Sequence, residues 1–324
     1  MKLLKEELIA RPDTPDPERI ATQALALSRK HSADVLLLNG DCYSVMETTV
    51  LEQLRRRRKD TERPKKLIFV LTTPGGIPET AYRMGRAIQN TYETSDALVG
   101  GWCKSAGTLL LISANTLILG DDAELGPLDI QLAKRDELNE RDSGLVISEA
   151  LANLEIYAFE FFDEFMRQIK DKSHGLVTLK TASEISASIA KGLFEPIYRQ
   201  IDPQKIGEIA RSMAVGRSYA QRLNLKPKNL QKYALENLLR GYPSHGFVID
   251  RQEAAELFHR VREPDSEETA FLLELGELAV SPSRKPIAML FKHEEEDHES
   301  KRAVAPKKAV KRVQKSARTS SRAR

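Results

Sequence analysis

Residues 67–76, LIFVLTTPGG, bring an apolar run to an abrupt end at one proline and two glycines. The part from Leu67 to Thr72 has the composition of a buried β-strand. Pro74, Gly75 and Gly76 then form a turn, in which glycine permits a positive φ. Two consecutive residues without side chains also leave backbone N–H groups open to approach, as a site that binds an oxyanion requires. The stretch predicts a strand followed by a plain turn or a binding turn.

The same strand-and-turn pattern recurs along the first half of the chain. Its other instances are Val35 to Leu38 before Asn39-Gly40, Ala97 to Val99 before Gly100-Gly101, and Thr116 to Leu119 before Gly120. A helix opening at Pro78 would place Ile77, Ala81, Met84 and Ile88 on one face. Apolar strands that alternate with helices favour a largely parallel sheet covered on both sides, with ligands beyond the carboxyl ends of the strands.

The second half of the chain is predicted to be mostly helical. Residues 146–169 form a long apolar segment that carries five of the nineteen aromatic residues, and we expect it to be buried in the core or against another subunit. Further helices are predicted over residues 183–213, 228–239 and 251–261. The last of these has Asp250 and Glu253 at the spacing of a capping box.

Composition indicates a cytoplasmic globular protein. The chain has 324 residues, only two cysteines (Cys42 and Cys103), no apolar secretory signal at its amino end and no run of about 20 apolar residues. Ten Lys or Arg and no acid lie between Lys301 and Arg324, so with a total of +3 the first 300 residues carry −7. We expect this basic tail to be disordered and to be a solubilising or self-associating extension, or a contact for nucleic acid or another anionic surface.

A candidate nucleophile lies in GGWCKSAGTLLLISAN, residues 100–115. Ser105 falls where a helix should begin after a strand, so the helix dipole and the N–H of Ala106 lie near its oxygen. The alternative is that Ser105 only caps the helix. Together, Gly75 and Gly76 would supply donors from one strand end and Ser105 a nucleophile from the next, as expected of an acyl-transfer site.

These residues resemble a known group. The PGG turn, the SAGT sequence about thirty residues later and TLILGDDAELGPLD at 116–129 resemble the superfamily of the Clp protease proteolytic subunit and signal peptide peptidase. The chain is most similar to the serine dehydrogenase proteinase family, over residues 34–131 and, less closely, 242–258. The resemblance implies an α/β fold that is a crotonase-like (Clp protease-like) spiral of ββα units, with added C-terminal helices. It also implies an ATP-independent serine peptidase that acts on a polypeptide substrate.

By this resemblance, Ser105 would be the nucleophile, and the N–H groups of Gly76 and Ala106 would bind the oxyanion. Gly126 and Pro127 would shape the pocket wall. We also expect a homo-oligomer, either a ring or a smaller assembly, in which residues 146–169 contact a neighbour. We expect residues 1–30 to be an extension, 31–280 the peptidase domain and 281–324 a charged tail.

The general base stays open at this point. His245, in YPSHGFVIDRQEAAELF at 242–258, occupies the place of a triad member in the Clp subunits, but it could also be a structural loop histidine. Relatives of signal peptide peptidase use a lysine, for which Lys134 and Lys104 are the candidates. Asp129 is our choice for the acid that orients His245, although an aspartate there often caps a turn.

The sequence predicts no cofactor and no metal site. No Cys and His spacing indicates zinc, and no GxxxxGK[ST] motif is present to bind a nucleotide. Two alternative functions stay open: a crotonase-like enzyme that processes an acyl-CoA, and a noncatalytic scaffold for peptides or nucleic acid with a degenerate site.

Overall fold

The computed structural model describes residues 16–128, 131–133 and 141–293. Its contacts divide the chain into a compact unit, Met1–His293, and a second unit, Glu294–Arg324. The predicted boundaries at residues 30 and 280 both fall within the first unit, where elements on either side of them pack on the same sheet. Those domain boundaries stay a prediction.

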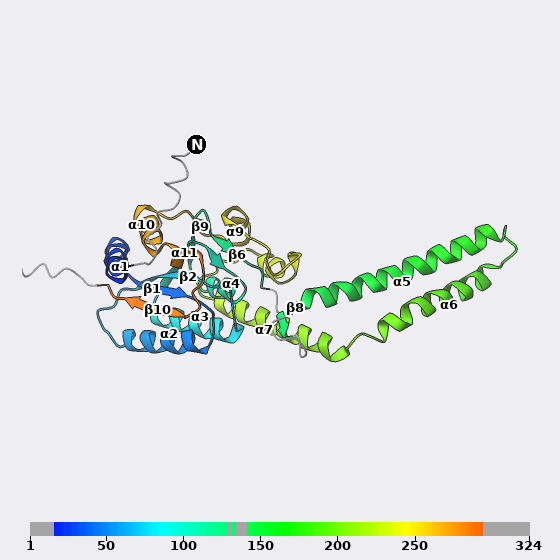
Figure 1. The fold of residues 1–324 in the computed structure, drawn as a ribbon, viewed down its shortest axis with the longest axis horizontal. Coiled ribbons are helices and arrows are strands. Elements are labelled where there is room, and N and C mark those ends of the chain that lie inside the picture. Colours follow the sequence, from blue (N-terminus) through cyan, green and yellow to red (C-terminus); the bar gives the residue numbers. More distant parts are fainter. Residues whose placement is uncertain (1–15, 129–130, 134–140, 294–324) are drawn as a thin grey trace, which may run out of the picture. The chain divides into compact units, whose positions relative to one another are not determined.

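A six-stranded sheet forms the centre of the first unit (Figure 1). Its order is β10-β1-β2-β3-β5-β9, and every neighbouring pair is parallel except β10 with β1. The bounds are Ala33–Asn39 for β1, Lys66–Thr72 for β2, Thr94–Val99 for β3, Thr116–Leu119 for β5, Val261–Arg262 for β9 and Ile287–Phe291 for β10. The strands predicted from the sequence are confirmed, and the protein is an α/β protein with a mainly parallel sheet.

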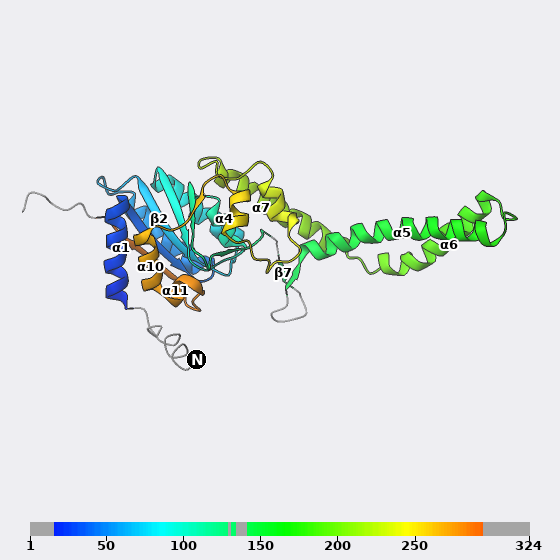
Figure 2. The ribbon, with the colours of Figure 1, turned by 90° about the horizontal axis from the view of Figure 1, so that it is seen from above.

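Helices cover both faces of this sheet (Figures 1 and 2). One face carries α1 (Pro17–His31), α10 (Ser266–Leu275) and α11 (Glu277–Val280). The other carries α2 (Ser44–Arg57), α3 (Pro78–Thr91), α4 (Ala106–Leu111), α7 (Pro203–Asn224) and α9 (Arg251–Leu257). In α3, Ala81, Met84 and Ile88 are fully buried as predicted, whereas Ile77 is 44% exposed because it precedes the first turn.

A buried ion pair joins the second helix to the first strand. Both oxygens of Asp34 accept from Arg57, at 2.7 and 3.0 Å, and the hydroxyl of Tyr92 donates to the same carboxylate at 2.7 Å. The backbone N–H of His293 is a further donor, at 2.7 Å. These donors on both carboxylate oxygens offset the cost of burying the ion pair.

Short extended segments follow the main strands and pair with one another. Strand β4 (Trp102–Cys103) runs parallel to β6 (Glu124–Leu125), and single bridges join Cys42 to Gly76, Thr73 to Cys103 and Leu125 to Ile249. A separate hairpin is formed by β7 (Gln131–Ala133) and β8 (Arg141–Ser143). The turns after β1, β2, β3 and β5 are thereby linked into a second, smaller layer of pairings.

The aromatic segment forms a long helix that is only partly covered. Helix α5 (Gly144–Lys172) packs against α6 (Leu179–Tyr198), yet Phe159 is 71% exposed and Tyr157 51% exposed. Burial of this segment in the core of its own chain is therefore wrong, and burial against another subunit stays a prediction. No helix among the described residues is both long enough and apolar enough to cross a membrane.

Two other helix predictions need correction. The single helix expected over residues 183–213 is divided, because Asp202 caps a new helix, α7, that begins at Pro203. Residues 228–239 contain only a short turn, α8 (Ala234–Glu236), which continues as a π-helical segment over Asn237–Gly241. The start of the helix after Asp250 is confirmed, since the Asp250 side chain accepts from the N–H of Glu253 at 2.9 Å. The helix ends at Leu257 rather than at residue 261, because Val261 begins β9.

Candidate active site

Ser105 lies in the turn between β4 and α4 in a conformation that serine seldom adopts. Its φ is 51° and its ψ is −110°, and its side chain makes no capping hydrogen bond to the helix. Ser105 thus stands at the N-cap position of α4, but its side chain does not cap the helix. A strained residue at a strand-to-helix turn presents its side chain outward, as in the nucleophile turns of hydrolases.

Gly75 packs directly against this turn. Its φ is 113°, and a Cβ placed on it would lie 2.9 Å from the Cβ of Ser105 and 3.1 Å from the carbonyl oxygen of Lys104. The backbone nitrogen of Ala106 would lie 3.5 Å away. Only glycine permits both this φ and this approach. The glycine pair in the opening sequence is thus explained in part by contact with Ser105.

Gly76 makes a similar approach to the turn after β1. Its φ is 145°, and a Cβ there would lie 2.6 Å from the carbonyl oxygen of Cys42. The N–H of Cys42 donates to the carbonyl of Gly75 at 2.8 Å, and the N–H of Ile77 donates to that of Cys42 at 3.0 Å. These bonds fix the Gly75–Gly76 turn from the side opposite Ser105.

Two threonines, which the sequence analysis did not single out, join the turns. Thr73 exchanges backbone bonds with β4, since its N–H donates to Trp102 and its carbonyl accepts from Lys104, at 2.8 and 3.0 Å. Its hydroxyl also accepts from the N–H of Gly75 at 3.1 Å. The Gly75 amide is thus engaged within its own turn, which corrects the expectation that both glycine amides are bare.

The second threonine, Thr108, ties the start of α4 to the segment after β6. Its hydroxyl donates to the carbonyl of Gly126 at 2.7 Å and accepts from the N–H of Gly126 at 3.3 Å. A Cβ on Gly126 would lie 2.9 Å from Cδ of Lys104. The segment with Gly126 and Pro127 therefore lies beside the Ser105 turn. The signal that could have identified these threonines is their position, one before PGG and one within SAGT.

Two backbone donors remain open near Ser105. Among the described residues, none accepts a hydrogen bond from the N–H of Gly76 or of Ala106, and none bonds to the Ser105 hydroxyl. Ala106 is the first residue of α4, so its N–H has no acceptor within the helix. A half-buried hydroxyl beside open N–H groups has the chemical parts of an acyl-transfer site.

The structure describes only some of the residues proposed to act as, or to orient, the general base. Asp129 and Lys134 lie outside the described residues. Lys104 is only 9% exposed, and its ammonium lies 3.0 Å from a carboxylate oxygen of Glu124 and donates to the carbonyl of Leu125 at 3.3 Å. The Lys104 side chain is thus bound to β6 rather than to Ser105.

His245 lies in the loop between residue 241 and α9. This loop is anchored where Ile249 and Leu125 exchange backbone hydrogen bonds of 2.9 and 3.0 Å, one residue from Gly126. No hydrogen bond between described residues joins His245 to Ser105. The structure therefore brings together Ser105, Ala106, Gly75, Gly76 and Gly126, and it ties the His245 loop to the same region.

The two cysteines are not alternative nucleophiles. Both are fully buried, and burial raises the pKa of the Cys42 thiol to about 11 and that of Cys103 well above its ordinary value. Sγ of Cys42 lies 3.6 Å from the hydroxyl of Thr73. Since the thiolate is the reactive form, these thiols act as packing groups beneath the site.

One group of possible metal ligands occurs among the described residues, away from Ser105. Nε2 of His31 lies 3.1 Å from Asp265 and 3.5 Å from Glu268. Glu268 already accepts two hydrogen bonds of 2.6 Å from Arg262, and Asp265 caps α10. Both carboxylates therefore have structural partners, and we interpret the cluster of His31, Asp265 and Glu268 as part of the N-terminal cap of α10 rather than as a metal site.

Comparison with known proteins gives distant relatives. No family model matches the chain. One uncharacterized protein of Methanocaldococcus jannaschii is 28% identical over 83 residues, which are 26% of this chain and 29% of the relative. A second from the same organism is 19% identical over 188 residues, 58% of this chain and 64% of the relative. The chain therefore matches less than two thirds of the length of either one.

Solved structures give weak likenesses. A serine-to-alanine mutant of the 1510-N membrane-bound stomatin-specific protease has 14% identity and a TM-score of 0.28, and covers 46% of this chain and 67% of its own. A lysine-to-alanine mutant of that protease, in complex with a substrate peptide, has 12% identity and a TM-score of 0.39. The match covers 80% of this chain and 87% of that one. Both TM-scores lie below 0.5, so the following assignment depends on the geometry of this chain.

Proposed function

We propose that this protein is an ATP-independent serine peptidase in which Ser105 attacks the scissile carbonyl. The observation that carries the proposal is the strained turn at Ser105, packed against Gly75 and flanked by the open N–H groups of Gly76 and Ala106. In this reaction, Oγ of Ser105 forms a bond to the carbonyl carbon, and the carbonyl oxygen becomes an oxyanion that these N–H groups bind. A base takes the hydroxyl proton and delivers it to the leaving amine as the oxyanion collapses and the C–N bond breaks. Water then attacks the acyl-enzyme, releasing the acid and restoring the Ser105 hydroxyl.

The base is proposed to be His245, oriented by Asp129, with Lys134 as the alternative. The attachment of the His245 loop beside Gly126 supports His245, because one backbone pairing links it to the wall of the site. Lys104 is not favoured, since Glu124 holds its ammonium. Gly126 and Pro127 would form one side of the substrate groove.

We propose a fold family on the basis of the pairing of the short segments. The turns after successive main strands each contribute a short extended piece to a second layer, which is the pattern of ββα units that wind as a spiral. This pattern supports membership of the crotonase-like superfamily of the Clp protease subunit, near the serine dehydrogenase proteinases. We also propose a cytoplasmic homo-oligomer in which the exposed apolar residues of α5 and α6 contact a neighbouring subunit. The basic tail, 301–324, is proposed to bind an anionic surface.

A fluorophosphonate probe tests the function directly. The parent protein should be labelled, Ser105→Ala should not be, and Ser113→Ala should be labelled like the parent, because Ser113 lies at the other end of α4 and donates to Leu110. Equal labelling of the parent and Ser105→Ala would refute the proposal. Absence of labelling in all three, with retention on immobilised coenzyme A, would favour the acyl-CoA alternative instead.

The identity of the base requires the pH dependence of labelling. His245→Ala should remove the dependence near neutral pH, whereas His259→Ala, an exposed histidine after α9, should keep it. If Lys134→Ala alone removes the dependence, the base is the lysine and the assignment of His245 is wrong.

A further inference from the structure

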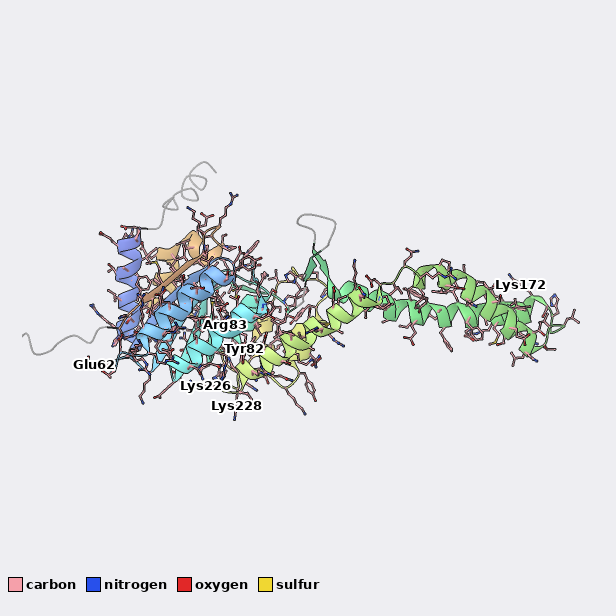
Figure 3. All side chains as sticks on the ribbon, turned by 90° about the horizontal axis from the view of Figure 1, so that it is seen from below. Glu62, Tyr82, Arg83, Lys172, Lys226 and Lys228 are labelled. Atoms are coloured by element: carbon pink, nitrogen blue, oxygen red, sulfur yellow. The ribbon has the colours of Figure 1, made fainter. Side chains whose placement is uncertain are left out.

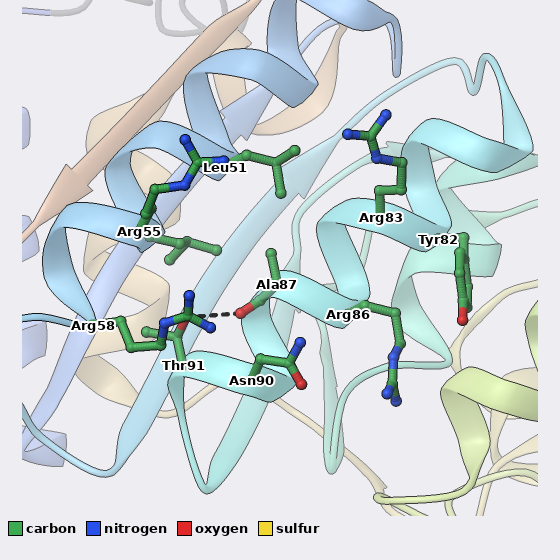
Figure 4. A pocket seen from close by; sticks show the side chains of 10 residues that line it. Leu51, Arg55, Arg58, Tyr82, Arg83, Arg86, Ala87, Asn90 and Thr91 are labelled. Carbon is green, nitrogen blue, oxygen red and sulfur yellow. Dashed lines mark hydrogen bonds between the residues drawn. The ribbon is translucent and has the colours of Figure 1, made fainter.

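A groove rich in arginine lies between α2 and α3, on residues that the proposed chemistry does not use. It is a cavity of about 260 Å³, and Figure 4 shows Arg55 and Arg58 on one side and Arg83 and Arg86 on the other. Leu51 and Ala87 lie between them. None of the residues that line the cavity is acidic. The groove thus combines an apolar floor with a rim of four positive charges.

Four consecutive arginines, residues 55–58 at the end of α2, differ in their partners. Arg57 is buried against Asp34, and Arg56 pairs with Glu52 on the outer surface of the helix. Arg55 makes no ion pair or side-chain hydrogen bond with any residue in the described part of the chain, and the same holds for Arg58. Of these four, the two that line the groove are therefore the two without a side-chain partner among the described residues.

The opposite rim is positive as well, although its side chains are better held. Arg83 pairs with Glu47 at 2.9 Å, and Arg86 donates to the neutral amide of Gln89 at 3.2 Å. Lys226 adds another charge nearby, because its ammonium donates to the carbonyls of Gln89 and Tyr92, at 2.7 and 2.6 Å (Figure 3). Arginines three residues apart on a helix lie about 5–6 Å from each other and repel, so a bound anion would relieve this repulsion.

We propose that this groove binds an acidic segment of a partner polypeptide. Guanidinium groups form paired hydrogen bonds with carboxylates, and the spacing along each helix matches carboxylates on successive turns of a bound helix. The cavity is smaller than the ~300 Å³ at which sites for whole small molecules begin, so it fits side chains that enter from a longer ligand. The floor of Leu51, Leu54 and Ala87 accepts their apolar parts.

The aromatic contact in the groove argues against nucleic acid. Single-stranded nucleic acid is held by bases that stack on exposed aromatic faces. One face of Tyr82 is already stacked on Tyr219, with ring centroids 4.3 Å apart and planes 15° apart. A phosphate backbone also has no apolar groups that could pack on the floor of the groove. A peptide with glutamate and leucine can pair its carboxylates with the arginine rim and pack its leucines on the apolar floor. Its binding does not depend on the chemistry of Ser105.

The test uses the full chain and a fluorescein-labelled 12-residue peptide of glutamate and leucine, followed by fluorescence anisotropy at low and physiological ionic strength. The double variant Arg55→Glu/Arg58→Glu should bind about tenfold or more weakly than the parent. Arg56→Glu is the control for charge reversal outside the groove. It lies between Arg55 and Arg58 and reverses one charge where the double variant reverses two, and it should bind within about twofold of the parent. The basic tail is identical in all of these proteins, so it cannot cause a difference between them.

Equal affinities of the double variant and Arg56→Glu would overturn the proposal. It would also be overturned if the double variant lost affinity for a single-stranded oligonucleotide and kept its affinity for the peptide. Circular dichroism checks that each variant is folded. If charge reversal unfolds the chain, Arg55→Ala/Arg58→Ala gives the same test, since both side chains are exposed.

Discussion

Replacement of Gly75 by alanine tests whether the two turns must be in contact. The added Cβ would lie 2.9 Å from the Cβ of Ser105 and 3.1 Å from the carbonyl of Lys104, and the residue would keep a φ of 113°. An L-residue at that φ costs about 1–3 kcal/mol. Relief of the close contacts costs about 1–3 kcal/mol more, because backbone atoms as well as a side chain must move.

The expected result for Gly75→Ala is therefore a loss of about 2–5 kcal/mol in the free energy of unfolding. We expect labelling of Ser105 by the fluorophosphonate probe to slow by about 100-fold, because a displacement near 1 Å is enough for such a loss. Urea unfolding, followed by circular dichroism, measures the first effect. The labelling rate under conditions where the variant is still folded measures the second.

Gly207→Ala is the matched control. Gly207 lies within α7, and a Cβ there would meet no atom within 4 Å. Alanine in a helix interior is better than glycine by about 0.5–1 kcal/mol, so this variant should be slightly more stable and should label at the parent rate. If Gly75→Ala matches Gly207→Ala in both measurements, the turns are not in contact and the proposed site is wrong.

Three further predictions concern buried charges and thiols. Lys104→Met should lower the free energy of unfolding by about 1–2 kcal/mol, since Glu124 loses its ammonium partner, and should change Ser105 labelling only a few-fold; a 100-fold loss would make Lys104 a base after all. Asp34→Asn should lower the unfolding free energy by about 3–5 kcal/mol, because it leaves the Arg57 charge buried without its carboxylate, and urea unfolding with a loss below 1 kcal/mol would contradict this. Burial raises the pKa of Cys42 from 9.0 to about 11, so the folded state keeps a proton that the unfolded state loses. The contribution of this thiol to stability should therefore be constant below pH 9 and fall by about 3 kcal/mol between pH 9 and 11. Cys42→Ala should reduce this alkaline decrease, and an unchanged slope in urea unfolding would show that the thiol does not cause it.

The parallel sheet was predictable because its information is local. The apolar runs at Val35–Leu38 and Leu67–Thr72 have the length and composition of buried strands, and glycine turns end them. Helix α3 followed from Pro78 and the spacing of its buried residues. Helix α5 was also predicted from its length and apolar character. Its degree of burial was not, since a single sequence does not show which neighbour covers an apolar face.

The residues of the candidate active site could be predicted from the sequence, but the hydrogen bonds and backbone angles of those residues could not. The motifs around Gly75, Gly76 and Ser105 identified which turns matter, because glycine pairs and a serine at a helix start restrict the possible chemistry. The φ of Ser105 and the use of the Gly75 amide by Thr73 required coordinates. The contact of Gly75 with the Ser105 turn joins segments about thirty residues apart, which no local pattern encodes. The bond from the Gly75 amide to Thr73 is local, between residues two apart, but the composition of the turn did not show which acceptor the amide takes.

The sequence by itself determined the parallel strands, the glycine turns that end them and the candidate nucleophile, because strand formation and turn geometry depend on neighbouring residues. The tertiary structure alone decided that Lys104 is bound to Glu124. It also decided that, within the described ranges, the Gly76 and Ala106 amides have no acceptor and the Arg55 and Arg58 side chains at the groove have no partner. Those outcomes depend on which distant segments pack together, and packing is a property of the whole fold.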